Sequence, residues 1–438
     1  MRLVHLSDIH FGGYGQSGWD EDEDQRRELV RDLERLVEDG GPVDGILVGG
    51  DIAFSAQPAE YEIADAWLEQ VCRAGGCDIS RVWVVPGNHD IDRAILTVSF
   101  ARSDFRQAVL SCAPQSIDKA LNDRLARDPA APGLMAALTE YNEFAGRWGP
   151  CSFSAAHPHW FDDTLSVGDA DVRLTGLNSV LVSDTHDGFI NDRPTLVLGT
   201  WQCSLPRGNR RIHIAFCHHP PNWLRDWELV EPYLLRAHLL LFGHEHRYAA
   251  RQRVADGTVE VFAGAVGPER LGEAPGEEYS PTWNLLTLEL DGEIVAVTVN
   301  PRVWYRHRTR FDLHPDDIRS FRVRVDLENL DMPDTSPSGE RREAPHEALP
   351  ASPLLPDYLA AEPPVESVSA GERSKRRSLG VRFMRLSPTE RLRVARNLEV
   401  AQGLDDPHLD PNEAGRTVLR RVRDAEKIDR LAEELENG

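Results

Sequence analysis

The sequence is poor in the features that place a chain in a membrane, outside the cell or on long DNA. Its 438 residues contain no apolar run that approaches the length of a bilayer span. We therefore do not expect the protein to associate with a membrane. The first apolar stretch already carries Asp8 and His10, so we expect no cleaved signal. The six cysteines lack the paired C-x-x-C spacing of a structural zinc site, which favours reduced thiols and a cytoplasmic location.

Positive charge is also in deficit, with 49 Lys and Arg against 72 Asp and Glu and a formal net charge of −23. Binding to long DNA depends on clustered Lys and Arg that face the phosphates, so this charge disfavours tight, sequence-independent binding of that kind. A local basic patch would escape that argument. The hydrophobic share of 41% and the charged share of 28% are typical of a globular protein and exclude wholesale disorder. The length allows two or three domains.

Short apolar runs rich in Val, Ile and Leu recur over the first 300 residues, and several end abruptly in polar residues. Such runs are typical of strands that are buried on both faces. Between the first two runs, residues 20–40 have an amphipathic pattern with acidic residues at its start, which predicts a helix. The alternation indicates a layered α/β domain whose functional residues gather at the carboxyl ends of its strands. The runs are residues 3–6, 45–48, 82–85, 212–216 and 239–242.

The chain divides further by composition. Helical periodicity over about 93–160, broken by prolines, predicts a helical cap inserted into a domain that covers 1–325. Residues 326–378 are dense in Pro, Ser and Glu, so we expect a disordered, flexible linker. Residues 379–438 predict a small, separately folded all-α module. Its two capped helices would begin at Pro388 and Pro411, with the second apolar stripe continuing as far as Leu435.

Five polar clusters stand where the predicted strands end. Each one alone has an ordinary structural explanation, since an Asp-x-His is more often a cap beside a surface imidazole and a Gly-Asp is usually a turn. Their joint occurrence is what indicates a functional site. In chain order the clusters are Asp8-x-His10, Gly50-Asp51, Gly87-Asn88-His89-Asp90, His218-His219-Pro220 and Gly243-His244-Glu245-His246.

The residue types in these clusters suit a pair of divalent cations. Two cations close together need a shared carboxylate that screens their repulsion, other neutral and acidic ligands, and room for water and a phosphate. A mixed nitrogen and oxygen set suits manganese, iron or zinc, whereas magnesium and calcium prefer oxygen alone. We therefore predict two divalent transition-metal ions as cofactors. The candidate ligands are Asp8, His10, Asp51, Asn88, His218, His244 and His246.

With these clusters in this order, the sequence resembles the calcineurin-like metallophosphoesterase family, whose signature is D-x-H, G-D, G-N-H-[DE], H and G-H-x-H. All five blocks are present without substitution, and the resemblance covers roughly residues 1–325. It implies the fold of that family, an α/β arrangement with a layered β-sandwich flanked by helices. It also implies a phosphoesterase in which a hydroxide held between two metals attacks phosphorus in line.

The resemblance implies a ligand set as well. The family pattern places a ligand two residues before Pro220, which selects His218 and leaves His219 a structural neighbour. The implied arrangement has Asp8, His10 and His246 on one metal, Asn88, His218 and His244 on the other, and Asp51 as the bridging carboxylate.

Other residues would handle the substrate. His89 would not bind metal but would sit over the substrate phosphate and help to protonate the leaving oxygen, and Asp90 would orient its ring. The catalytic candidates are therefore His89 and Asp90. The candidates for substrate binding are Asn88, His89 and Asn178, the last because it follows the strand-like run at 172–177.

The C-terminal module resembles the small helical adaptor, or effector-associated, domains that are appended to enzymes and NTPases in bacterial conflict and signalling systems. Its pattern fits a generic helical tail or a dimerisation element equally well. If it is an adaptor, residues 379–438 would bind a protein partner.

The sequence is compatible with two functions. The first is a binuclear metal-dependent phosphoesterase that hydrolyses a phosphodiester or phosphomonoester, with a nucleotide or nucleic acid as a candidate substrate in a bacterial signalling or defence system. The alternative is an adaptor or signalling protein whose helical module recruits partners, with the phosphoesterase acting on a phosphoprotein or a small phosphate ester. A purely non-catalytic scaffold would predict missing ligands, and none is missing.

Overall fold

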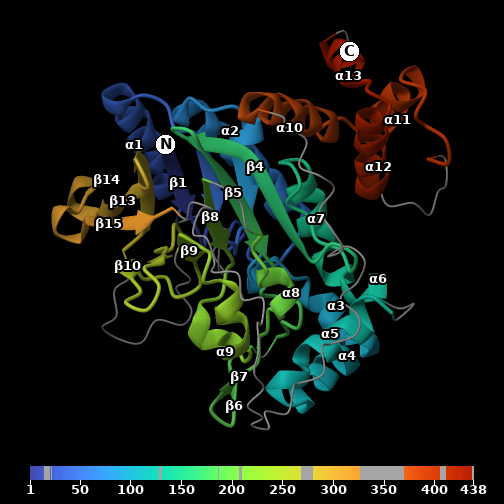
Figure 1. Ribbon diagram of the computed structural model, residues 1–438, viewed down its shortest axis with the longest axis horizontal. Helices are drawn as coiled ribbons and strands as arrows, with labels where there is room; N and C mark the ends of the chain where they lie inside the picture. Colours follow the sequence, from blue (N-terminus) through green and yellow to red (C-terminus); the bar gives the residue numbers. More distant parts are fainter. Residues whose placement is uncertain are drawn as a thin grey trace, which may run out of the picture.

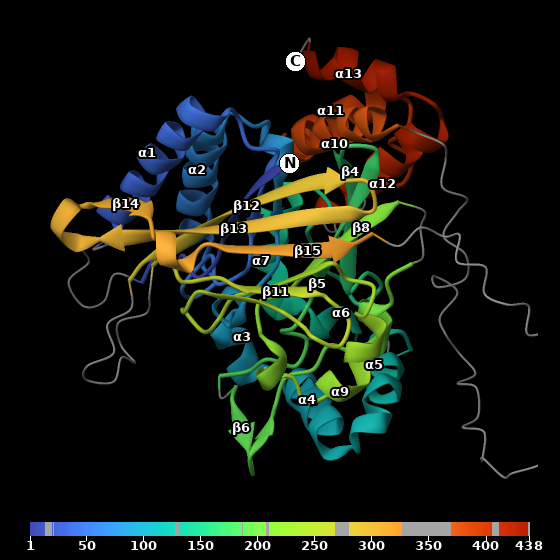
Figure 2. The ribbon, with the colours of Figure 1, turned by 60° about the vertical axis from the view of Figure 1, so that its left-hand side comes forward.

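Two β-sheets pack against each other through one large apolar core and carry helices on their outer sides (Figures 1 and 2). This is the predicted α/β fold, a layered β-sandwich flanked by helices, followed by helices at the C-terminus. The arrangement comes from a computed structural model, which describes residues 1–13, 20, 22–127, 131–185, 187–206, 210–267, 280–325, 369–404 and 411–436.

The first sheet has seven strands in the order β14-β13-β12-β1-β2-β3, with β15 also paired to β13. β1, β2 and β3 are parallel, whereas β12 runs antiparallel to β1. β2 and β3 are buried along their whole length, as the continuous apolar runs predicted. The strands are β1 (Arg2–Leu6), β2 (Gly45–Val48), β3 (Val82–Val84), β12 (Thr282–Asp291), β13 (Ile294–Tyr305), β14 (Arg310–Leu313) and β15 (Arg319–Arg324).

The second sheet has six strands in the order β10-β11-β9-β8-β5-β4, and its central strands β5, β8 and β9 are parallel. A separate two-stranded hairpin, β6 with β7, lies outside both sheets. The strands are β4 (His159–Val167), β5 (Ala170–Leu177), β6 (Phe189–Ile190), β7 (Arg193–Pro194), β8 (Arg211–Phe216), β9 (Leu239–Phe242), β10 (Ala249–Gln252) and β11 (Val259–Phe262).

Helices connect the parallel strands and form the cap and the C-terminal module. Helix α1 links β1 to β2, and helix α2, which begins with a capping box between Gln57 and Glu60, links β2 to β3. None of the helices in the described part of the chain has the length and apolar character of a membrane span. The helices are α1 (Glu23–Gly40), α2 (Pro58–Gly75), α3 (Arg93–Val98), α4 (Phe100–Ser111), α5 (Ile117–Leu125), α6 (Ala131–Leu134), α7 (Thr139–Gly146), α8 (Thr200–Cys203), α9 (Trp227–Val230), α10 (Ala370–Met384), α11 (Pro388–Asn397), α12 (Pro411–Asp424) and α13 (Ile428–Glu436).

The helical region predicted over about 93–160 is present as α3 to α7, which lie between β3 and β4. Helices α3 to α6 lie at one end of the molecule and α10 to α13 at the other, in both views (Figures 1 and 2). The two regions meet where α7 ends, since Arg377 of α10 donates a hydrogen bond to the carbonyl of Trp148.

The C-terminal region departs from the prediction in two places. Helix α10 begins at Ala370, so the predicted linker 326–378 extends too far, and its residues 326–368 lie outside the described residues. The predicted second helix is also wrong, because the chain leaves the helix at Glu426, whose φ is 55°, and α13 starts afresh at Ile428. α10 to α13 share a small apolar core of their own, centred on Phe383, Val394 and Val418.

Candidate metal centre

The polar clusters meet at one edge of the sandwich because of the strand directions. β1, β2 and β3 of the first sheet, and β8 and β9 of the second, each run toward this edge and end two to four residues before a predicted ligand. Carboxyl ends of parallel strands share one edge of a sheet, which is where open α/β folds place their sites. The loops that follow these five strands thus bring all seven predicted ligands to one region.

Five of these ligand positions hold a backbone conformation that residues other than glycine rarely adopt. Such left-handed conformations cost free energy and persist only where the surrounding structure enforces them, which is typical of functional sites. Their φ angles are 55° at Asp8, 54° at His10, 51° at Asp51, 71° at His244 and 57° at His246.

Two glycines are required by the close packing of the loops. Gly50 has φ 100°, and a side chain there would meet the ring of His218 at 2.7 Å. A side chain at Gly87 would meet the Asp51 carboxylate at 2.1 Å. The loops after β2 and β3 therefore approach each other only because both positions are glycine.

The first predicted ligand set is gathered in the structure. Ligand atoms of Asp8, His10 and His246 lie within 4.8 Å of one another, and Oδ1 of Asp8 is 3.2 Å from Nε2 of His246. Asp8 is fully buried and His10 nearly so. Three residues from two distant parts of the chain thus converge with one carboxylate and two imidazoles, the composition of a transition-metal site.

The predicted bridging residue lies between the two sets. Oδ2 of Asp51 is 3.2 Å from Nε2 of His218 on one side and 3.9 Å from Nε2 of His10 on the other. Its Oδ1 accepts a hydrogen bond from the backbone N–H of His89 at 2.8 Å. This arrangement leaves Oδ2 facing both groups of imidazoles, as a shared carboxylate requires.

The second set contains one histidine more than predicted. Ligand atoms of His218, His219 and His244 also lie within 4.8 Å of one another. However, both ring nitrogens of His219 are engaged, with Nδ1 2.9 Å from Oγ of Ser179 and Nε2 3.1 Å from Oδ1 of Asn88. This agrees with the structural role expected for His219, which here orients the amide of Asn88.

His218 differs from His219 because only one of its two ring nitrogens has a hydrogen-bond partner. Its Nδ1 lies 2.8 Å from the carbonyl of Gly49, which fixes the ring and leaves Nε2 directed into the centre. A hydrogen bond of this kind from the far nitrogen is what commonly orients a ligating imidazole.

Buried polar atoms in the centre fit a pair of cations. Within the described residues, Oδ1 of Asp8, Nε2 of His10 and Nε2 of His218 are buried and have no hydrogen-bond partner. Each such atom costs about 1–3 kcal/mol when it stays unsatisfied. Cations placed among them would satisfy all three at once.

The electrostatics of the centre also suit metal binding. Burial lowers the pKa of His10 to about 3 and that of His244 to about 3, so both imidazoles are neutral, the form that binds metal. Burial lowers the pKa of His218 as well, but Asp51 and Asp8 outweigh it and raise that pKa to about 9. The carboxylates thus hold a positive charge at the point where a cation is predicted.

The Asp90 carboxylate bonds to two loops and to a tyrosine, and its role in orienting the His89 ring stays a prediction. Its carboxylate accepts hydrogen bonds from the backbone N–H groups of Ile52 and Gly87, at 3.1 and 2.9 Å, and from the hydroxyl of Tyr61 at 2.9 Å. Because the 3-10 turn Asn88–Asp90 directs this side chain back into the fold, Asp90 ties the loop after β2 to the loop after β3. It therefore positions these two loops relative to each other.

The His89 ring is held by a backbone carbonyl. Its Nδ1 lies 2.8 Å from the carbonyl oxygen of Phe54, and its Nε2 lies 3.5 Å from Nη2 of Arg93. The ring centroid is 4.7 Å from that of His10. His89 is thus beside the first ligand set with Nε2 directed toward an exposed cation.

Asn178 is fully buried at the end of β5. Its Oδ1 accepts a hydrogen bond from the backbone N–H of Val180 at 3.0 Å, and its own N–H donates to Gln202 at 2.8 Å. These bonds give it a structural role in the turn, and a contact with substrate remains a prediction.

Sequence reasoning missed three residues around the centre, namely Ser179, Arg93 and Trp223. None of them lies in a motif. In the sequence, only their distance from a motif could have indicated two of them: Arg93 follows His89 by four residues, and Trp223 follows His218 by five.

Comparison with known proteins supports the same family. The model of the family described as calcineurin-like phosphoesterase matches residues 1–248, more than half of the chain. No curated protein shows significant similarity to the chain.

Solved structures resemble the chain at low identity. Vps29 from Chaetomium thermophilum is 10% identical, with 74% of this chain and 100% of that one covered and a TM-score of 0.32. A dimetal phosphatase from Danio rerio is 13% identical, with 73% and 98% covered and a TM-score of 0.35. Vps29 from Entamoeba histolytica, solved with Zn²⁺, is 11% identical, with 74% and 99% covered and a TM-score of 0.29.

The family assignment rests on the match over residues 1–248 and on the five motifs that meet at one centre. The C-terminal helices lie beyond that match, so their resemblance to adaptor domains stays a prediction. The family predicted from the motifs is confirmed, and the chain belongs to the calcineurin-like phosphoesterases.

Proposed function

We propose that the protein is a binuclear metal-dependent hydrolase of phosphate esters, and that its substrate is a phosphodiester or phosphomonoester carried by a nucleotide or nucleic acid. One observation carries this proposal. Buried, unsatisfied ligand atoms from the loops after β1 and β8 face one another at the edge where all five motifs meet.

The chain offers a complete ligand set for two cations. When bound, two divalent ions of the manganese, iron or zinc type would supply an activated water and neutralise phosphoryl oxygens. Asp51, between the two sets, would screen the repulsion between the cations. The proposed sets are Asp8, His10 and His246 for one ion, and Asn88, His218 and His244 for the other.

His89 is proposed as the group that handles the leaving oxygen. With Nδ1 directed at the carbonyl of Phe54, a protonated ring presents its second N–H at Nε2. That proton would pass to the departing oxygen, and Asp51 holds the backbone of His89 in place through the bond to its N–H. The exposed guanidinium of Arg93 beside Nε2 adds positive charge where a phosphate would lie.

Replacing His89 by Gln is expected to leave the metal content at the wild-type level and to lower kcat by roughly 10²- to 10⁴-fold, the usual reach of general acid catalysis. The loss should be greatest for esters with poor leaving groups, which need protonation most. Metal content by elemental analysis and kcat for a series of aryl phosphate esters check this, with the surface variant His307→Gln as control. Loss of metal in His89→Gln would instead make His89 a ligand.

The proposed function is tested by loading the protein with Mn²⁺, Fe²⁺ or Zn²⁺ and measuring turnover of bis-p-nitrophenyl phosphate and p-nitrophenyl phosphate in parallel. Faster turnover of the first ester identifies a phosphodiesterase, and faster turnover of the second identifies a phosphatase. No turnover of either ester by metal-loaded protein would contradict the proposal.

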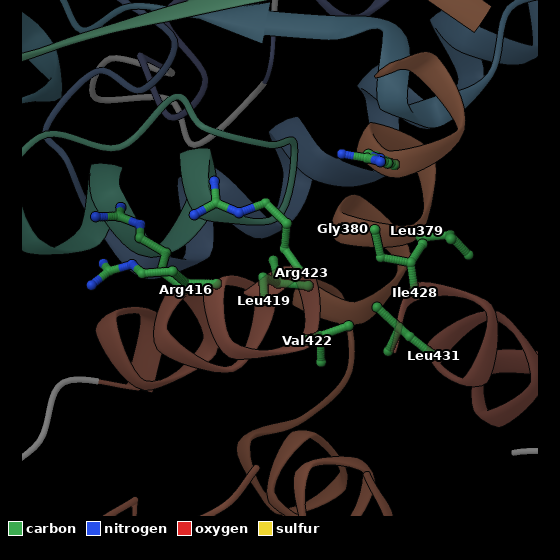
Figure 3. A pocket seen from close by; sticks show the side chains of 10 residues that line it. Leu379, Gly380, Arg416, Leu419, Val422, Arg423, Ile428 and Leu431 are labelled. Atoms are coloured by element: carbon green, nitrogen blue, oxygen red, sulfur yellow. The ribbon is translucent and has the colours of Figure 1, made fainter. Parts of the chain in front are cut away.

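A second role, partner binding by α10 to α13, is favoured by one surface feature. A cavity of about 380 Å³ lies among α10, α12 and α13, where Leu379, Ile428 and Leu431 gather (Figure 3). Arg416 and Arg423 lie at its border. An apolar cavity bordered by arginine suits an acidic amphipathic segment of a protein partner, as in the adaptor alternative. A Leu419→Asp variant that keeps ester turnover but loses such a partner would support this role.

A further inference from the structure

An aromatic wall runs outward from the second ligand set. Trp223, at the end of the 3-10 turn Pro221–Trp223, packs its ring against His244 with centroids 4.1 Å apart and an interplanar angle of 84°. Phe189 on β6 follows, with its centroid 5.6 Å from that of Trp223. Three rings thus lead in sequence from a proposed metal ligand to the surface.

The outer end of this wall is exposed. Phe189 is 54% exposed and its neighbour Ile190 is 53% exposed, on a hairpin that projects from the body of the protein (Figures 1 and 2). Large apolar side chains exposed side by side beside a site commonly mark a surface that a ligand covers. Packing in the core of the domain does not explain a phenylalanine at this position, since more than half of Phe189 is exposed.

The hairpin holds Phe189 in a fixed place relative to Trp223. Residues Asn191 and Asp192, with φ of 51° and 61°, make the tight turn between β6 and β7. Beyond β7, the chain is tied to the segment after Trp223 by a bridge between Leu196 and Leu224. The two rings are therefore positioned together, as a preformed binding surface requires.

The positively charged side chain of Arg93 lies on the other side of the metal centre, beside His89. The guanidinium of Arg93 is exposed and lies 3.5 Å from Nε2 of His89. A ligand that spans the centre would therefore meet positive charge at one end and aromatic faces at the other. A phosphate ester that carries an aromatic ring at some distance from phosphorus would suit such a site, with its phosphate near the positive charge and its ring against the aromatic faces.

We propose that Phe189 and Trp223 form a stacking platform for a nucleobase, so that the substrate is a nucleoside phosphate ester. This inference rests on the proposed phosphoesterase function and names its substrate class. Base stacking on aromatic side chains tolerates any sequence and binds unpaired bases. The net charge of −23 further favours a mononucleotide ester or the end of a single strand over duplex DNA.

The test uses two esters that share a leaving group. Thymidine 5′-(p-nitrophenyl phosphate) carries a nucleobase and methyl p-nitrophenyl phosphate does not. Phe189→Leu keeps the apolar volume but removes the aromatic face, Phe189→Tyr restores it, and Phe161→Leu is the control. Phe161 is 47% exposed on β4 and lies beside α10. Binding of thymidine 5′-monophosphate, measured by calorimetry, gives a readout that is independent of turnover.

We expect Phe189→Leu to raise KM for the thymidine ester and Kd for thymidine 5′-monophosphate by roughly 5- to 150-fold, the range for loss of one stacked base. Turnover of the methyl ester should stay unchanged, and Phe189→Tyr and Phe161→Leu should behave as wild type. Hydrolysis of both esters with no dependence on Phe189 would overturn the platform alone. Failure of the metal-loaded wild type to hydrolyse these two esters and also p-nitrophenyl phosphate and bis-p-nitrophenyl phosphate would overturn the proposed function and this inference together.

Discussion

Replacing Asp51 by Asn is expected to remove bound metal and activity together. The Asp51 carboxylate faces His218 at 3.2 Å and His10 at 3.9 Å and is only 2% exposed, so it approaches an imidazole of each ligand set. An amide has nearly the same shape but no charge, and two cations held close together then repel each other without screening. The loss of metal affinity should exceed the 10- to 100-fold that follows when a mere orienting partner is removed.

The measurement is elemental analysis of protein reconstituted with Mn²⁺, Fe²⁺ or Zn²⁺, together with turnover of bis-p-nitrophenyl phosphate. The matched control is Asp226→Asn, a buried carboxylate that accepts hydrogen bonds from the backbone of Leu198 and Gly199 outside the centre. That variant should keep its metal. The absence of bound metal from reconstituted wild-type protein, or full metal content in Asp51→Asn, would contradict the assignment.

Much of the catalytic domain could be predicted from the sequence because its signals are local. The predicted strands at 45–48 and 239–242 coincide with β2 and β9, and that at 3–6 falls within β1. Continuous apolar runs identify strands that both faces of a sheet bury, and the polar residues that follow such runs identify the functional edge. The ligand cluster was predictable for the same reason, since each ligand lies within four residues of the end of a strand.

The contacts of Asp90 could not be predicted in the same way. A carboxylate next to a histidine in sequence was expected to orient that ring. In the structure it accepts N–H groups from a loop 38 residues earlier and the hydroxyl of Tyr61 on α2. Such pairings depend on how two loops and a helix meet in space, and nothing in the local pattern Gly-Asn-His-Asp specifies them.

Helix α10 was missed because its charges resemble those of a solvated linker. Residues 373–377 are rich in Arg and Ser and were included in the predicted linker. In the structure the same charges are used in tertiary contacts, since Arg373 pairs with Asp171 at 2.6 Å and Arg377 with Asp162 at 2.8 Å. Sequence composition cannot separate a charge in water from one that pairs across a buried interface.

The consequence of these contacts is that the C-terminal helices are anchored to the catalytic domain at α10. Arg377 has a side chain only 4% exposed. Its Nη2 donates hydrogen bonds to the carbonyls of Val82 and Trp148, at 2.8 and 3.0 Å, and its guanidinium lies 4.5 Å from the centroid of the Trp83 ring. One side chain thereby joins α10 to β3, to β4 through Asp162 and to the end of the cap.

Replacing Arg377 by Ala is therefore expected to destabilise the whole protein by about 3–5 kcal/mol, because it leaves the carboxylate of Asp162 buried without its cation. The neighbouring variant Arg376→Ala is the control. Arg376 has a side chain 33% exposed and pairs with Glu372 one turn away on the same helix, so its loss should cost about 0–1 kcal/mol. Urea unfolding midpoints of the two variants and the wild type check the difference.

Ester turnover separates this stabilising role from a catalytic one. No proposed ligand lies after His246, so Arg377→Ala protein that remains folded at low temperature should hydrolyse bis-p-nitrophenyl phosphate at nearly the wild-type kcat while unfolding at a lower urea concentration. Equal destabilisation by Arg376→Ala and Arg377→Ala would show that α10 is not anchored at Arg377. A large fall in kcat for folded Arg377→Ala would show instead that α10 transmits an effect to the metal centre through β3, whose following loop carries Asn88 and His89.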